Sequence, residues 1–157
     1  MRQHTGRLAV VYDLGVFDPQ LAPRLEVDYL PMRVGGACQH AKIMALVVRD
    51  RKSEQQSIVL GAGSFNLTKA GWWDNLEVGH WVELRADFAP SNIHRPLLDA
   101  LRFYQTHSPS HVLEAILGVA QSLKTTADDP NCTFYFSGSG AGRTHFDAFI
   151  SKQAMGG

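Results

Sequence analysis

The residues best suited to chemistry in this sequence lie between positions 40 and 77, and together they could hold and attack an oxyanion. They are His40, Lys42, Gly63, Ser64, Asn66 and Glu77. Lysine supplies positive charge, serine and asparagine supply hydrogen-bond donors, and glycine lets the backbone approach a ligand closely. A neutral imidazole can attack phosphorus to form a covalent intermediate, which divides a difficult displacement into two easier steps. These residue types therefore predict a site for a phosphate or a phosphodiester.

A β-hairpin is the element expected to position these groups. The apolar stretch 37–48 and the apolar run 57–62 are typical of strands, and the charged segment 49–56 connects them. A direct connection of this kind joins antiparallel neighbours. Both strands therefore carry their chemistry-bearing residues at the end of the hairpin that lies away from the connection.

The alternation of side chains along a strand indicates which groups share a face. His40 and Lys42 are two residues apart and point to the same face. Ser64 and Asn66 follow the second strand and emerge at the same end of the hairpin as His40. We therefore expect an imidazole, an ammonium, a hydroxyl and an amide to converge on one pocket. Glu77 could accept the other imidazole N–H and so fix the tautomer of the ring.

The remaining sequence predicts an α/β fold. Further strands are expected at 7–12, 27–30, 76–84 and 132–136. Apolar residues at helical spacing predict a helix from Asn92, and Ser110 can N-cap a second helix. A glycine-rich turn and a short helix from Thr144 end the pattern. Strands, then two helices, then a strand–loop–helix unit are typical of a sandwich with a mixed β-sheet flanked by helices.

The composition is that of one folded domain. The chain has 157 residues, of which 45% are hydrophobic and 19% are charged. Lys plus Arg (15) equals Asp plus Glu (15), so no overall basic field indicates nucleic acid, although a local basic patch stays open. No apolar run is long enough to cross a bilayer, and there is no signal-peptide pattern. Cys38 and Cys132 are far apart and form no metal-type pair, so we expect a cytoplasmic location.

The chemistry-bearing residues also resemble a known motif. His40-Ala-Lys42, followed by Gly63-Ser-Phe-Asn66 and Asn75-Leu-Glu77, is similar to the HKD motif of the phospholipase D superfamily. That motif is His-x-Lys, a spacer, an Asp, then Gly-Ser-x-Asn, often with a later glutamate. The resemblance covers roughly residues 36–84. It implies a phospholipase D-like sandwich and a metal-free, two-step phosphodiester transfer.

The resemblance also implies a role for each matching residue. His40 would be the nucleophile, Lys42 and Asn66 would hold the phosphate oxygens, and Glu77 would orient His40. Ser64 and the backbone at Gly63 would assist in binding. Lys69 either contacts a phosphate or is a solvated helix residue. No metal or other cofactor is implied.

Two departures from the motif bear on the substrate. The position of the Asp is taken by Val47, which makes the chain similar to the tyrosyl-DNA phosphodiesterase branch; the run that follows Asn66 is similar to that branch as well. The spacer before Asn66 is longer than usual, and the loop 49–56 accounts for this at little cost. The resemblance therefore favours a nuclease or a DNA-repair hydrolase over a lipid-acting enzyme. The absence of an amphipathic basic helix favours the same choice.

The family also uses a second histidine, which protonates the leaving oxygen. The sequence contains no other His-x-Lys. Either the chain forms a homodimer in which two motifs meet, or it is the first half of a two-motif protein. In the second case 1–125 is one domain, and 126–157 begins a second repeat. Otherwise 126–157 is the C-terminal strand–loop–helix of the same domain.

Other functions stay open. The chain could be a non-catalytic module that binds nucleic acid or phosphate, or a lipid-acting phosphatidyl transferase. A zinc site is a further reading, because several residues are of zinc-ligand type. These are Cys38, His40, His80 and Cys132. Their spacing is not that of a recognised zinc site, so we expect no metal.

Overall fold

The computed structural model describes residues 8–13, 28–32, 40–64, 76–136, 150–151 and 154. The strands are β1 (Ala9–Asp13), β2 (Asp28–Met32), β3 (Ile43–Arg49), β4 (Gln56–Gly63) and β5 (Gly79–Leu84). The helices are α1 (Ser91–His107) and α2 (His111–Ser122). Each of these strands overlaps a segment predicted from the sequence, although β3 begins later than the apolar stretch 37–48.

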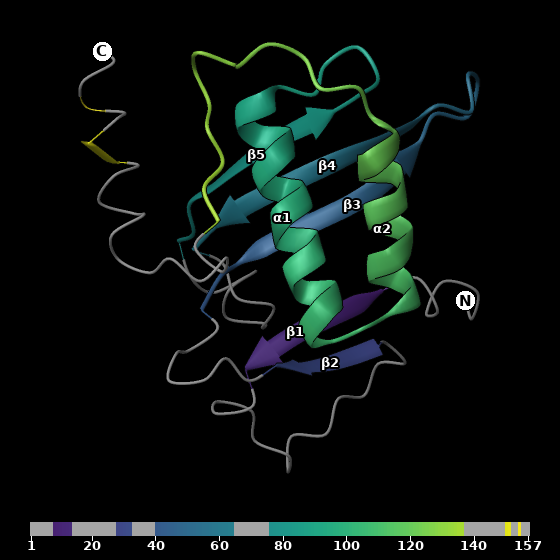
Figure 1. Ribbon diagram of the computed structural model, residues 1–157, viewed down its shortest axis with the longest axis vertical. Helices are drawn as coiled ribbons and strands as arrows, with labels where there is room; N and C mark the ends of the chain where they lie inside the picture. Colours follow the sequence, from purple (N-terminus) through teal and green to yellow (C-terminus); the bar gives the residue numbers. More distant parts are fainter. Residues whose placement is uncertain are drawn as a thin grey trace.

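The strands form two sheets. β1 pairs with β2 in parallel, whereas β3, β4 and β5 form an antiparallel sheet with β4 in the centre. Figure 1 shows α1 and α2 lying across the same side of the strands. The α/β class is confirmed, and the predicted hairpin is β3–β4. The predicted single mixed sheet is not seen in the described residues, because the parallel and the antiparallel strands belong to separate sheets.

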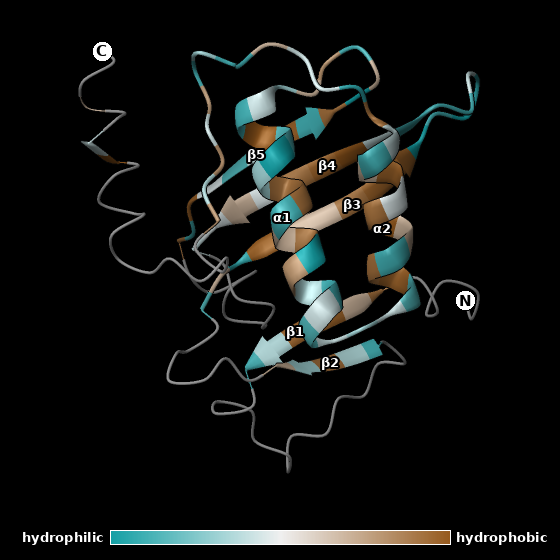
Figure 2. Ribbon diagram, in the orientation of Figure 1, coloured by the Kyte–Doolittle hydropathy of each residue, from teal (hydrophilic) through white to brown (hydrophobic). Residues whose placement is uncertain are grey.

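The core lies between the strands and the two helices. Ile58 and Leu60 of β4 and Leu84 of β5 face the helices and are almost fully buried. Helix α1 contributes residues spaced by three or four positions, as a one-sided apolar stripe requires. They are Ile93, Leu97, Ala100, Leu101 and Tyr104. Figure 2 shows hydrophobic residues concentrated on β3 and β4 and interrupted by polar ones along both helices. Each large buried side chain contributes about 1.5–3 kcal/mol.

Polar contacts fix the ends of the helices. Ser110 is the N-cap of α2, as predicted, and its Oγ accepts the Val112 N–H at 3.1 Å. The buried ring of His94 joins α1 to the end of α2. Its Nε2 lies 2.8 Å from the Ala120 carbonyl oxygen, and its Nδ1 lies 3.0 Å from Thr125 Oγ1. Both ring nitrogens are therefore satisfied inside the core.

The predicted strand at 132–136 is not a strand. Its residues have no regular secondary structure and belong to neither sheet. The backbone is held instead by the start of α1, where the side chain of Asn92 donates to the carbonyls of Asp129 (2.8 Å) and Cys132 (2.9 Å). The Phe134 N–H donates to the Asn92 carbonyl at 3.1 Å. Aromatic and β-branched residues favour extended backbone, but these contacts supply its hydrogen bonds without a neighbouring strand.

The Asn92 carbonyl is available to the segment because of a proline in α1. In an unbroken helix the N–H of residue 96 would donate to it, but Pro96 has no N–H. The lost helical hydrogen bond is replaced by the one from Phe134. A local defect in the helix therefore becomes the attachment point of the segment that follows α2.

Some predicted elements lie outside the described residues. These are the glycine-rich turn and the start of the helix predicted from Thr144; residues 150, 151 and 154 are helical. The division at 125/126 stays a prediction. Among the helices that the structure describes, none is both long and apolar enough to cross a membrane.

The contact between Gly61 and Trp81 predicts a cost for any side chain at position 61. The two residues are cross-strand partners, and a Cβ placed on Gly61 would lie 2.4 Å from the indole ring. Gly61→Ala should therefore displace the ring and lower the free energy of unfolding by about 1–3 kcal/mol. Urea unfolding followed by tryptophan fluorescence measures this change.

Gly118 supplies the matched control. It lies within α2, and a Cβ there would meet nothing within 4 Å. Gly118→Ala should raise the free energy of unfolding by about 0.5–1 kcal/mol, since alanine is the better helix former. Equal effects of the two substitutions would contradict the packing described for Trp81.

Candidate functional site

The described candidate residues lie at one end of the antiparallel sheet. His40 and Lys42 precede β3, Gly63 ends β4 and Ser64 follows it, and Glu77 precedes β5. The Gly63 N–H donates to the Lys42 carbonyl at 3.2 Å, which continues the β3–β4 ladder by one pair. The hairpin therefore brings together segments that are some twenty residues apart in sequence, as predicted. Asn66 and Lys69 lie outside the described residues.

His40 and Lys42 contact each other directly. The Lys42 ammonium lies 3.1 Å from His40 Nδ1, 3.2 Å from Nε2 and 3.1 Å from the His40 carbonyl oxygen, to which it donates. The lone pairs and N–H bonds of the two ring nitrogens diverge in the ring plane. A cation equally close to both nitrogens therefore lies against the face of the ring, as in a cation–π contact. His40 is exposed, so an incoming anion could reach both groups.

Ser64 and Glu77 form a second pair. The Ser64 hydroxyl donates to Glu77 Oε2 at 2.5 Å and accepts the Val78 N–H at 3.0 Å. The Ser64 N–H donates to the Val78 carbonyl at 2.8 Å. These bonds tie the end of β4 to the residues before β5. Serine has one O–H to donate, and here the Glu77 carboxylate accepts it.

The strand register places Lys42 and Ser64 on different faces of the sheet. Ile43 is opposite Ala62, so Lys42 is opposite Gly63 and shares its face. Side chains alternate, and in this register Ser64 belongs to the other face. No hydrogen bond among the described residues joins His40 or Lys42 to Ser64 or Glu77. The expected groups that the structure describes therefore lie at the same end of the sheet, but no hydrogen bond joins one pair to the other. Glu77 Oε2 accepts the Ser64 hydroxyl, and the role of Glu77 in orienting His40 stays a prediction.

The charged loop between β3 and β4 is too distant to take part. It lies at the opposite end of the hairpin. From the rise per residue of a β-strand, the loop is about 20 Å from Lys42. Three of its charged side chains are also held locally: Arg49 bridges Glu54 at 3.2 Å, and Asp50 accepts hydrogen bonds from the backbone of Ser53 and Lys52. These backbone bonds lower the pKa of the Asp50 carboxyl. The loop is a self-contained turn.

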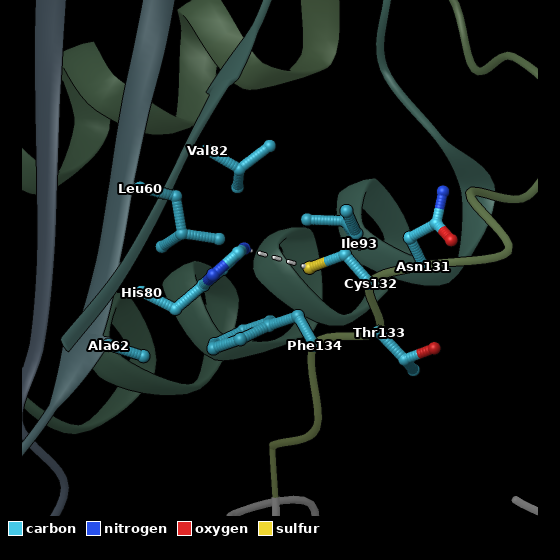
Figure 3. A pocket seen from close by; sticks show the side chains of 9 residues that line it. All are labelled: Leu60, Ala62, His80, Val82, Ile93, Asn131, Cys132, Thr133 and Phe134. Carbon is cyan, nitrogen blue, oxygen red and sulfur yellow. Dashed lines mark hydrogen bonds between the residues drawn. The ribbon is translucent and has the colours of Figure 1, made fainter. Parts of the chain in front are cut away.

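His80 and Cys132 are in contact, although the sequence groups them only as residues of zinc-ligand type. His80 Nε2 lies 3.3 Å from Cys132 Sγ, and both line a pocket of about 270 Å³ (Figure 3). Cys38 lies outside the described residues, and no group of three or more His, Cys, Asp or Glu among those described could hold a metal. Fifty-two positions separate His80 from Cys132, and no motif links them.

Comparisons with family models, with curated proteins and with solved structures found no match to this chain. The resemblance to the phospholipase D superfamily therefore rests on the motif residues themselves. Of those, the structure describes His40, Lys42, Gly63, Ser64 and Glu77.

The Ser64–Glu77 hydrogen bond predicts an energetic coupling between the two side chains. In a double-mutant cycle with Ser64→Ala and Glu77→Gln, the coupling in the free energy of unfolding should be about 0.5–1 kcal/mol, because Ser64 is exposed. Urea unfolding of the four proteins measures it. Ser64→Ala combined with Glu54→Gln, at the far end of the hairpin, should be additive. Additivity in both cycles would refute the pairing.

Proposed function

We propose that the chain is a phosphodiesterase of the phospholipase D type that acts on nucleic acid through a phosphohistidine at His40. The observation that carries the proposal is the exposed His40–Lys42 pair at the end of the antiparallel sheet. An imidazole and an ammonium this close to each other could engage the same phosphate, which supports the proposal. The fold of the whole enzyme would be the phospholipase D-like sandwich, of which the described α/β layers are a part.

In the first step an unprotonated ring nitrogen of His40 attacks the phosphorus of the phosphodiester. A nitrogen–phosphorus bond forms, and the bond to the leaving oxygen breaks. The Lys42 ammonium exchanges its contact with the ring for a charge-assisted hydrogen bond to a non-bridging phosphate oxygen, which is a stronger interaction. Stabilisation of this oxygen in the transition state is the main contribution of Lys42.

In the second step water attacks the phosphohistidine and releases His40. Both steps need a proton donor and acceptor at the leaving or attacking oxygen. We assign that role to a second histidine, from the partner in a homodimer or from a second motif-bearing half. Asn66 remains the proposed amide donor to the phosphate. Nucleic acid is preferred to phospholipid because the motif lacks the Asp and is similar to the DNA-acting branch.

A second candidate function is a phosphate-binding module without catalysis. The Ser64–Glu77 bond favours it, because it engages the carboxylate that catalysis would use to orient His40. Binding needs only the positive charge and the donors. Lys42 would then matter for affinity, and His40 would be dispensable.

The proposal predicts turnover that survives EDTA and depends on His40. With a p-nitrophenyl phosphodiester and a labelled oligonucleotide as substrates, His40→Ala should lower turnover by at least about 10³-fold, as expected for loss of a nucleophile. Lys42→Ala should cost about 10²–10³-fold, as for loss of one transition-state donor. His111→Ala is the control, because His111 is fully exposed at the start of α2. The mass in solution is measured alongside.

The outcomes separate the two candidate functions. Turnover that persists in His40→Ala, or that EDTA abolishes, would overturn the phosphohistidine mechanism. Oligonucleotide binding without turnover, weakened by Lys42→Ala and unchanged by His40→Ala, would establish the binding module instead. Activity on phospholipid vesicles but not on oligonucleotides would move the substrate class to lipids.

A further inference from the structure

The pocket beside Cys132 lies on the helix-facing side of the antiparallel sheet. Ala62 and His80 line it from paired positions on β4 and β5, and Phe134 closes it from the segment after α2. Figure 3 shows the side chains of His80, Cys132 and Phe134 converging, with Ile93 behind them. Its volume of about 270 Å³ is just below the ~300–1,000 Å³ of sites for drug-sized ligands. A small molecule or one small group therefore fits.

A thiol and a base meet in this pocket. Cys132 Sγ and His80 Nε2 lie 3.3 Å apart, a normal distance for a hydrogen bond to sulfur. When Nε2 is unprotonated it accepts the thiol proton, and this is the pairing that activates a cysteine nucleophile. His80 lies on β5 and Cys132 follows α2, so two elements of the fold bring the pair together.

The position of Cys132 is fixed on both sides. The side chain of Asn92 donates to the Cys132 carbonyl at 2.9 Å and to Thr133 Oγ1 at 3.2 Å. Its Oδ1 accepts the Asp129 N–H at 3.0 Å, and its backbone carbonyl accepts the Phe134 N–H at 3.1 Å. Because one residue at the start of α1 holds the chain before and after Cys132, the thiol is directed at His80 by the fold.

The surroundings favour one kind of reaction. Burial raises the pKa of the Cys132 thiol, and the charge of Asp129 raises it further, so the resting form is the neutral thiol. Little thiolate is therefore present at neutral pH, and the reaction depends on His80 to remove the proton; the thiolate that then forms is a strong nucleophile. The walls nearest the sulfur are apolar: Leu60, Val82, Ile93 and Phe134. Apolar walls tolerate the diffuse charge of a thiolate better than the concentrated charge of an oxyanion. They therefore favour a reaction at sulfur.

We propose that this pocket is a thiol-exchange site, separate from His40, at which Cys132 forms a mixed disulfide with a small disulfide that has apolar substituents. His80 takes the proton from Sγ as the sulfur attacks one sulfur of the ligand. A new sulfur–sulfur bond forms, the ligand's own sulfur–sulfur bond breaks, and His80 returns the proton to the departing thiolate. The disulfide is the only co-reactant. The inference does not rest on the phosphodiesterase activity.

The test uses the full chain and 4,4′-dithiodipyridine, a small neutral aromatic disulfide whose released thiopyridone absorbs light. Peptide mapping should find the mixed disulfide on Cys132. At pH 7, His80→Asn should slow its formation by about 10²-fold, the lower end of a general-base contribution. The difference should shrink at high pH, where hydroxide forms the thiolate without His80. A structural role of His80 would not produce this pH dependence.

Two controls make the result specific. His111→Asn removes a remote exposed imidazole and should leave the rate unchanged. Cys132 should react faster with 4,4′-dithiodipyridine than with the dianionic 5,5′-dithiobis(2-nitrobenzoate). This ratio of rates should be larger for Cys132 than for free N-acetylcysteine, because the pocket is apolar. Modification confined to Cys38, or equal rates at pH 7 for wild type and His80→Asn, would overturn the proposal. If His80→Asn fails to fold, His80→Gln and the mapping of the wild-type chain decide the question.

Discussion

The antiparallel register of β3, β4 and β5 determines where every candidate group lies. In this register Lys42 shares a row with Gly63, and Ala62 shares the next row with His80. A shift of one residue would exchange the two faces of a strand. The register is fixed by burial, because Ile58 and Leu60 must face the helices together with Leu84. The apolar core therefore decides which polar groups can meet at the end of the sheet.

The same sheet end carries two candidate sites because its faces differ. The face with Lys42 points away from the helices, and His40 beside it is open to solvent. The face with His80 points toward α1, and the segment held by Asn92 lines the pocket beside His80, whose side chain is exposed. If residue 96 had an N–H, that group would donate to the Asn92 carbonyl within the helix. The backbone irregularity in α1 thus adds a hydrogen bond to the segment that carries Cys132, which the Asn92 side chain also holds.

Local patterns in the sequence predicted local structure. The hairpin, the two helices and the Ser110 cap follow from periodicity and from the hydrogen bonding of one side chain, which act over a few residues. Predictions failed where partners are distant. The segment 132–136 has strand-forming residues, but its partner is the side chain of Asn92, some forty positions earlier. Ser64 was placed with His40 because periodicity does not give register, and its contact is Glu77.

The two sites make different demands on the protein around them. Phosphodiester transfer needs a second acid–base group and access for a polymer, so an exposed His40 with its lysine is only part of a site. Thiol exchange needs one base, one sulfur and a small cavity, and the described residues supply all three. On these two proposals, a monomeric chain would be competent in the thiol chemistry, whereas the phosphate chemistry would need a partner chain or a second motif-bearing half. The oligomeric state consequently bears on the first site and not on the second.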